Sequence, residues 1–186
     1  MYESPITTAR LELHHIPVPG LIALFEDKDG RLAIAGRDFT NPYKNLIASS
    51  GPLAWRVPQV KESPELNKWF VRFIVLASTR EIIGSTSFHG APDSSGMIEI
   101  GLGIEDAFQG QGFAKEALIG MWLWASNFPE VKTLRYTVSP DNLASIKVIE
   151  YFGFQFMGQQ MDEIDGPENI YEESAQNFKA RWRSIE

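Results

Sequence analysis

The feature that most constrains the fold is a change of hydrophobic period within residues 98–125. Over residues 98–104, apolar positions alternate with glycine or glutamate, which predicts a β-strand because successive side chains of a strand point to opposite faces. Residues 109–114 then form a glycine-containing loop, Gln-Gly-Gln-Gly-Phe-Ala. Over residues 114–125 the apolar positions recur at spacings of three and four, which predicts an amphipathic helix packed against a sheet.

The loop between this strand and this helix has the properties of an anion site. Gly110 and Gly112 lack the side chains that would keep a ligand away from the backbone. The first N–H groups of the helix have no partners within it and lie at the positive end of its dipole, so they favour phosphate. Lys115 adds a positive charge in the first turn. We therefore expect residues 109–114 to bind a phosphate or pyrophosphate group.

Two common phosphate-binding motifs do not fit this loop. A dinucleotide fingerprint that began at Gly110 would need glycine or alanine where this chain has Lys115. The Gly-Lys-Ser/Thr ending of a P-loop is absent as well. A nucleotide-phosphate enzyme is therefore disfavoured. An ordinary strand-to-helix turn without a ligand remains an alternative on this motif alone.

Residues 109–114 resemble the acyl-CoA loop of the GNAT superfamily of N-acetyltransferases, whose pattern is Gln/Arg-x-x-Gly-x-Gly/Ala behind an apolar strand. Residues 142–154 resemble a second element of the superfamily, with Asn-x-x-Ser, an apolar helix and a final Gly-Phe. They follow the loop with one predicted strand between. The opening Thr-x-Arg-Leu-x-Leu at residues 8–13 is similar to the branch that includes the ribosomal-protein N-terminal (Rim-type) acetyltransferases.

This resemblance implies a set of acetyl-CoA contacts. The backbone at the end of the central strand would pair with the pantetheine arm and donate to the thioester carbonyl oxygen. The loop would hold the pyrophosphate, Asn142 the cofactor arm, and Ser145 would approach the sulfur. The implied contacts are Leu102, Gly103, Ile104, Gln109, Gly110, Gln111, Gly112, Phe113, Ala114, Asn142 and Ser145.

The candidate catalytic residues are Glu99 and Ser145. Related enzymes often use a tyrosine one turn after the serine as the acid, but Ile149 occupies that position and Tyr151 lies on another helical face. Ser145 is therefore the candidate residue that assists the departing thiolate. The alternative for Ser145 is a serine on the solvent-facing side of the helix. The alternative for Asn142 is a helix N-cap.

Glu99 is the candidate general base because it is the only carboxylate within the central strand. Burial among isoleucines would raise its pKa toward the range that suits a base. Its interpretation as a strand-start residue that faces water stays open. A relay through bound water is allowed. Glu105, Asp106 and the carboxylates before Lys68 are the other candidates.

The remaining segments predict an α+β fold of the GNAT type, with a mixed, mainly antiparallel central sheet of about six to seven strands flanked by helices. The other expected strands cover residues 8–13, 69–77, 82–89, 133–138, 154–161 and 169–172. The strand at 133–138 is expected to pair in parallel with 98–104, and the helix after Asn142 to end at Gly153. A length of 186 residues with 44% hydrophobic side chains suits one domain over residues 1–186.

Residues 17–68 are rich in turn residues, and only a short helix over residues 21–26 is expected there. The resemblance places part of the acceptor cleft in this region, which makes Phe39, Tyr43, Trp55 and Arg56 candidate acceptor contacts. We favour the simpler interpretation that the aromatic side chains anchor loops on the core. A turn is expected at residues 165–167 and a polar, aromatic-bearing end over residues 177–186.

Composition narrows the chemistry. The chain has no cysteine, which excludes disulfides, thiolate metal sites and a cysteinyl acyl intermediate. A net charge of −7 argues against nucleic acid as a partner and is compatible with a basic acceptor. The three histidines lack the spacing of a metal site, so no metal is expected. No apolar run reaches the ~20 residues of a membrane span and the start lacks signal-peptide features, so we expect no membrane association and a cytoplasmic location.

These observations predict an N-acetyltransferase that moves the acetyl group of acetyl-CoA directly to a primary amine, either a protein N-terminus or a small molecule. The alternative is a non-catalytic acyl-CoA-binding module, which would keep the loop but lack a base and an open acceptor cleft. The sequence leaves the acceptor and the formation of a homodimer open.

Overall fold

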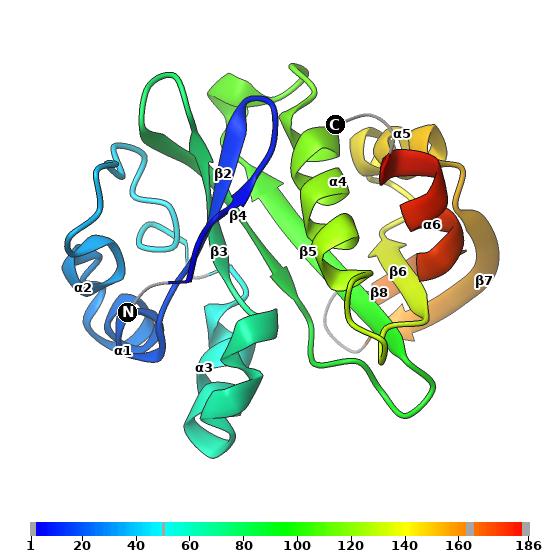
Figure 1. Ribbon diagram of the computed structural model, residues 1–186, viewed down its shortest axis with the longest axis horizontal. Helices are drawn as coiled ribbons and strands as arrows, with labels where there is room; N and C mark the ends of the chain where they lie inside the picture. Colours follow the sequence, from blue (N-terminus) through cyan, green and yellow to red (C-terminus); the bar gives the residue numbers. More distant parts are fainter. Residues whose placement is uncertain (1–2, 50, 163–165, 184–186) are drawn as a thin grey trace.

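The computed structural model describes residues 3–49, 51–162 and 166–183, and within them the strands form one sheet of eight strands (Figure 1). The strands are β1 Ile6–Thr7, β2 Leu11–His15, β3 Arg72–Leu76, β4 Glu81–Phe88, β5 Met97–Ile104, β6 Thr133–Val138, β7 Gln155–Asp162 and β8 Gly166–Ser174. Their order across the sheet is β1-β2-β3-β4-β5-β6-β8-β7. The expected strands are therefore confirmed, and the short β1 was not anticipated.

The sheet is mixed but mainly antiparallel, as predicted. All neighbouring strands pair antiparallel except β5 and β6, which pair in parallel. A parallel pair needs a crossover connection, and the predicted helix after the glycine loop supplies it. The expected α+β architecture of the GNAT type is confirmed.

The helices form two groups. The helical segments are α1 Val18–Ile22, the π-helix η1 Ala23–Asp27, α2 Arg31–Ile34, α3 Leu53–Glu62, the 3-10 helices η2 Pro64–Trp69 and η3 Asp106–Phe108, α4 Phe113–Ala125, α5 Leu143–Phe152 and α6 Ala175–Trp182. In Figure 1, α1, α2 and α3 gather on the side of the view where the N-terminus lies, and α4, α5 and α6 on the other. No helix in the described ranges is both long and apolar enough to cross a bilayer.

Two strands, β2 and β3, begin three residues later than predicted, and β8 is longer than the predicted residues 169–172. Residues 8–10 form a turn between β1 and β2, closed by a 2.9 Å hydrogen bond from the Thr8 N–H to the Leu11 carbonyl. Leu11 and Leu13 of β2 are fully buried. Trp69 belongs to η2 rather than to a strand, and its indole packs edge-on against Trp124 at a centroid distance of 5.3 Å. Its β-forming character reflects core packing, which does not require strand geometry.

The region of residues 17–68 is more helical than the sequence suggested. The helix expected at residues 21–26 is α1 continued by η1, and α3 was not anticipated. The buried positions of α3 include Leu53, Val57 and Val60, which have helical spacing. Pro58 lies inside this helix and obscured the pattern, because proline normally ends or kinks a helix.

The C-terminal end is part of the core rather than a polar tail. Phe178 and Trp182 of α6 are buried, and Phe178 lies 5.3 Å from Trp122 of α4 between ring centroids. Trp122 also contacts Phe152 of α5 at 5.1 Å, so one aromatic cluster joins α4, α5 and α6. Of the turn expected at residues 165–167, Gly166 lies at the start of β8 and residue 165 lies outside the described residues, as do residues 184–186.

We predict that Phe178→Ala lowers the free energy of unfolding by about 3–5 kcal/mol, because it leaves a cavity in this aromatic cluster. Denaturant unfolding monitored by circular dichroism measures the change. The control is Gln176→Ala on the exposed side of α6, which should change stability by less than about 0.5 kcal/mol. Equal stability of the Phe178 variant and the wild type would contradict the packing role of α6.

Candidate active site

The site begins where β5 and β6 diverge. They pair in parallel only from Met97 opposite Thr133 to Glu99 opposite Arg135. Beyond that point β5 continues alongside β4 to Ile104, whereas β6 continues alongside β8 to Val138. The divergence leaves one edge of β5 without a neighbouring strand over residues 100–104.

The register of β4 and β5 decides which backbone groups face this opening. The His89 N–H donates to the Glu99 carbonyl at 2.8 Å, and the Glu105 N–H donates to the Ile83 carbonyl at 2.9 Å. In an antiparallel pair, hydrogen-bonded residues alternate with residues whose backbone groups point the other way. The backbone groups of the even-numbered residues of β5, Leu102 among them, therefore point into the opening toward β6.

The glycine loop follows directly at the end of β5. Gly110 and Gly112 have φ values of 73° and 84°, in the left-handed region that favours glycine. Gly112 is the N-cap of the 13-residue helix α4. The Gln109 side chain donates to the Ile104 carbonyl at 2.9 Å, which ties the loop to the strand end. The free N–H groups of the first turn of α4 are thereby held next to the opening.

Contacts with the N-terminal hairpin, formed by β1 and β2, fix the position of the first turn of α4. One carboxylate oxygen of Glu116 accepts from the Arg10 backbone N–H at 2.6 Å and from the Thr8 hydroxyl at 2.7 Å. The other accepts from the Arg10 guanidinium at 2.7 Å. The same guanidinium donates to the Gln111 carbonyl at 3.2 Å and lies over the Phe113 ring. The short turn between β1 and β2 thus holds the loop and α4 in register.

A cleft of about 640 Å³, the loop cleft, lies between the end of β5, the glycine loop and α5. It collects all of the predicted acetyl-CoA contacts except Gln111. That residue does not line the cleft because its side-chain amide donates to the Ala107 carbonyl at 3.1 Å. The lining residues are Leu102, Gly103, Ile104, Phe108, Gln109, Gly110, Gly112, Phe113, Ala114, Lys115, Tyr136, Asn142, Ala144, Ser145, Lys147 and Val148.

Helix α5 contributes Asn142 and Ser145 to this cleft. Asn142 is the N-cap, as predicted, since its side-chain oxygen accepts from the Ser145 N–H at 3.1 Å. Tyr136 of β6 is a lining residue that sequence reasoning missed. Burial raises the pKa of its phenol, an effect partly offset by a hydrogen bond with the Ser145 side chain. Leu143, the first residue of α5, is 66% exposed.

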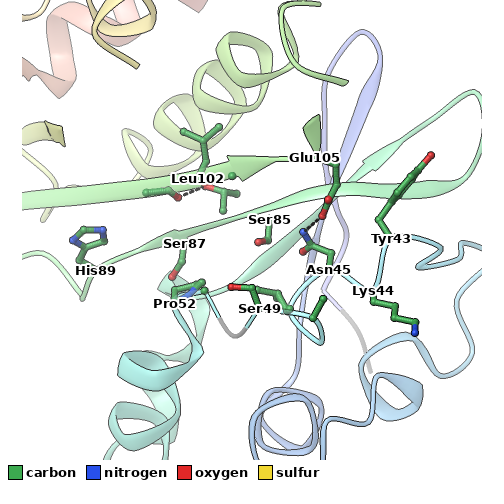
Figure 2. Close-up of a pocket in the computed structure, with 16 residues that line it drawn as sticks. Tyr43, Lys44, Asn45, Ser49, Pro52, Ser85, Ser87, His89, Leu102 and Glu105 are labelled. Carbon is green, nitrogen blue, oxygen red and sulfur yellow. Dashed lines mark hydrogen bonds between the residues drawn. The ribbon is translucent and has the colours of Figure 1, made fainter. Parts of the chain in front are cut away.

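A second cleft, of about 400 Å³, lies over β4 and β5 and is called the β4–β5 cleft (Figure 2). Figure 2 shows His89 at one end, Tyr43 and Glu105 at the other, and Ser85 and Ser87 of β4 along the floor. Its residues are Tyr43, Lys44, Asn45, Leu46, Ala48, Ser49, Gly51, Pro52, Ser85, Thr86, Ser87, His89, Gly101, Leu102, Gly103 and Glu105. The two clefts share Leu102 and Gly103, so they meet at this point of β5.

The four candidates from residues 17–68 have different positions. Tyr43 lines the β4–β5 cleft and lies edge-on to Phe108 at 5.4 Å. Phe39 is buried in the core, as the simpler interpretation held, whereas Trp55 is 55% exposed and does not anchor a loop. Arg56 is buried, and its guanidinium donates to the Gln59 side chain at 2.9 Å. Of the four, only Tyr43 is among the residues that line this cleft.

The environment of Glu99 differs from the prediction. Its carboxylate contacts polar groups rather than isoleucines: it accepts from the Thr137 hydroxyl at 2.5 Å and lies 3.2 Å from Nδ1 of His89. Burial alone would raise the pKa of the Glu99 carboxyl. Hydrogen bonds and charges from His89, Thr137 and Arg135 lower it by more, so its pKa is below its ordinary value. The expected upward shift is therefore wrong, because the register of the sheet pairs Glu99 with donors.

Among the described residues, no group of three histidine, aspartate or glutamate side chains could hold a metal ion. The polar groups around the opening are backbone N–H groups, hydroxyl groups and the pair formed by His89 and Glu99.

Comparison with known proteins identifies the family to which this chain belongs. The model of the Acetyltransferase (GNAT) domain family matches residues 38–155. The chain belongs to the GNAT acetyltransferase family. It is therefore an acetyl-CoA-dependent N-acetyltransferase, and the resemblance found in the sequence is confirmed.

One relative and two solved structures illustrate how far the similarity extends. The chain is 29% identical over 150 residues to the uncharacterized N-acetyltransferase YjdG of Bacillus subtilis strain 168, covering 80% of this chain and 88% of the relative. The ribosomal-protein-S5-alanine acetyltransferase of Vibrio fischeri has a TM-score of 0.66 at 15% identity, over 95% of this chain and 100% of that one. The microcin C7 self-immunity acetyltransferase MccE, solved with acetyl-CoA and AMP, has a TM-score of 0.60 at 16% identity, over 91% and 94%. The two structures establish a shared fold.

Proposed function

We propose that this GNAT protein, acting as one domain, transfers the acetyl group of acetyl-CoA, bound in the loop cleft, directly to a primary amine bound in the β4–β5 cleft. The observation that carries the proposal is that the two clefts meet at Leu102 and Gly103, at the open edge of β5. A thioester carbon held there is accessible from both sides. The amine belongs to a protein N-terminus or to a small molecule.

The loop cleft suits acetyl-CoA in shape and charge. The pyrophosphate would lie on the N–H groups at the start of α4, where unpaired donors and the helix dipole favour anions. Lys115 and Lys147 line the same cleft and would add positive charge for the phosphates. The pantetheine arm would take the place of the missing strand beside β5 and pair with the backbone of Leu102.

The β4–β5 cleft suits a protonated or polar acceptor. Ser85, Thr86 and Ser87 give its floor a polar character. Glu105 carries a negative charge at one end, where its carboxylate accepts from the Asn45 amide at 2.7 Å. The Glu105 carboxylate would attract an ammonium group, whereas Lys44 on the same lining carries the opposite charge. A non-catalytic acyl-CoA-binding module would not need this second opening.

Direct transfer needs three events at the meeting point. The ammonium loses a proton, since an α-amine has a pKa near ~8 and a lysine near ~10.4, and only the neutral nitrogen attacks. In this proposal the Leu102 N–H donates to the carbonyl oxygen as negative charge develops there. The C–S bond breaks as the N–C bond forms, and the electron pair stays on the sulfur. The chain has no cysteine that could carry the acetyl group in between.

Ser145 is the proposed hydrogen-bond donor to the departing thiolate, in line with its place in the loop cleft. Tyr136 supports this role, because its phenol lines the same cleft and interacts with the Ser145 side chain. The pair can present a hydroxyl proton toward the sulfur without either residue changing its charge. Glu99 contributes to proton removal on the acceptor side.

We expect the protein to release free thiol from acetyl-CoA when a primary amine is supplied. The panel contains peptides with free N-termini, polyamines and aminoglycosides, and mass spectrometry identifies the acetylated nitrogen. N-terminally blocked peptides are the matched control for the α-amine. Tight acetyl-CoA binding without thiol release for any amine would contradict acetyl transfer.

Gly112→Val should weaken acetyl-CoA binding at least about tenfold, because a β-branched side chain at a φ of 84° distorts the loop. Calorimetric titration measures the affinity. Gly36→Val is the matched control, since Gly36 has a φ of 70°, lies in neither cleft and would carry a similar backbone penalty. Equal affinities of the two variants would remove the loop from the cofactor site.

Ser145→Ala should slow acetyl transfer while leaving acetyl-CoA affinity nearly unchanged, because the contact with sulfur strengthens in the transition state. A thiolate is a fair leaving group, so we expect a loss smaller than the ~10²–10⁴ typical of a general base. Single-turnover rates measure the effect. Ser126→Ala, at the end of α4 and outside both clefts, is the control. A wild-type rate for Ser145→Ala under chemistry-limited conditions would exclude the role.

A further inference from the structure

His89 lies at the end of β4 and lines the β4–β5 cleft. Its side chain is 46% exposed, so the ring is accessible from the cleft. Its Nδ1 lies 3.2 Å from the Glu99 carboxylate, and its backbone N–H donates to the Glu99 carbonyl at 2.8 Å. Glu99 thus contacts His89 twice, through its carboxylate and through its backbone carbonyl.

The other ring nitrogen of His89 lies close to β5 near the meeting point of the clefts. A Cβ atom placed on Gly101 would lie only 3.2 Å from Nε2, so the ring occupies the space that the glycine leaves free. Gly101 immediately precedes Leu102, whose backbone faces the opening of the sheet. Nε2 is therefore the imidazole nitrogen nearest to the proposed site of acetyl transfer.

Glu99 is held behind His89 rather than in the cleft. It lines neither the loop cleft nor the β4–β5 cleft, and its side chain is only 16% exposed. The Thr137 hydroxyl donates to it from β6. An acceptor amine in the β4–β5 cleft therefore reaches the imidazole before it reaches the carboxylate.

The charges around this pair keep the carboxylate ionised. From β6, Arg135 contributes positive charge and is itself paired with Glu172 of β8 at 2.5 Å. From α3, the buried Arg56 interacts with Glu99; burial lowers its pKa to about 10, which leaves it protonated at neutral pH. An ionised carboxylate accepts the Nδ1–H of His89, so the lone pair of the neutral ring is on Nε2.

We propose that His89 is the general base that takes the proton from the acceptor amine, and that Glu99 is a positioning residue that orients the imidazole. This assignment rests on the proposed function. The Nε2 lone pair accepts one ammonium proton, and the neutral amine attacks the thioester carbon. The N–C bond forms and the C–S bond breaks, and the electron pair of the C–S bond stays on the sulfur. The acylated nitrogen then loses its second proton to the thiolate, which leaves a neutral amide and a free thiol. The imidazolium returns the first proton to solvent. The arrangement follows the logic of a carboxylate that fixes the tautomer of a catalytic histidine.

The kinetic test compares His89→Gln, Glu99→Gln and the double variant, using the panel amine that the wild type acetylates fastest. We expect His89→Gln to lower kcat ~10²–10⁴-fold with acetyl-CoA affinity unchanged, and its kcat to become first-order in hydroxide. Glu99→Gln should lower kcat but keep the acidic limb of the wild-type pH–rate profile. The double variant should be no slower than His89→Gln. Added imidazole should restore activity to His89→Ala.

Two results would overturn the assignment while leaving acetyl transfer intact. One is an active wild type whose kcat is matched by His89→Gln. The other is loss of the acidic limb in Glu99→Gln but not in His89→Gln, which would make the carboxylate the base. Failure of the wild type with every amine is a separate result that contradicts the proposed function.

A spectroscopic test needs no acceptor. In alkaline buffer, ¹⁵N chemical shifts of the wild-type protein should show His89 with its proton on Nδ1 and a free lone pair on Nε2. The Glu99→Ala variant should lose this preference, whereas Glu105→Ala, which removes a carboxylate at the other end of the cleft, should keep it. A proton on Nε2 in the wild type would overturn the proposed orientation.

Discussion

The parting of β5 from β6 is the constraint on which the rest of the site depends. Pairing stops after Glu99 and Arg135 because β6 goes on to pair with β8 while β5 stays with β4. A sheet edge with unpaired backbone groups is costly unless water or a ligand satisfies it. Here the edge is bordered by a phosphate-suited loop on one side and by the β4–β5 cleft on the other. The same gap that interrupts the sheet leaves backbone donors of β5 without a strand partner, and these are the donors proposed to act in acetyl transfer.

Helix α4 holds the two halves of the divided sheet in position. Its Trp122 packs with Phe152 and Phe178 in the C-terminal half, whereas its Trp124 packs with Trp69 and other aromatic rings nearer β3 and β4. At its first turn, Glu116 binds the N-terminal hairpin. One helix therefore fixes the width of the gap, the orientation of the loop and the position of the loop cleft.

The candidate site was predictable in part: residues with local sequence patterns were predicted, and residues that depend on contacts between strands were not. Gly112 and Asn142 were found because a loop with positive φ and a helix N-cap leave short local patterns. His89 was not predicted because the role proposed for it depends on its lying opposite Glu99, and a connection of several residues between two strands does not specify their register. The pKa of Glu99 was predicted in the wrong direction for the same reason, since its donors come from β4 and β6.

By itself, the sequence determined the elements whose backbone follows from side-chain period: β5, the glycine loop, α4, β6 and α5 with its caps. These depend on neighbours a few residues apart, where alternation, helical spacing and glycine act directly on the backbone. The tertiary structure alone decided the extent of the β5–β6 pairing, the burial of α6 and the bond between Arg10 and Glu116, which are 106 residues apart. Such contacts arise from packing of the whole chain, because each is formed only when distant segments bury a common surface.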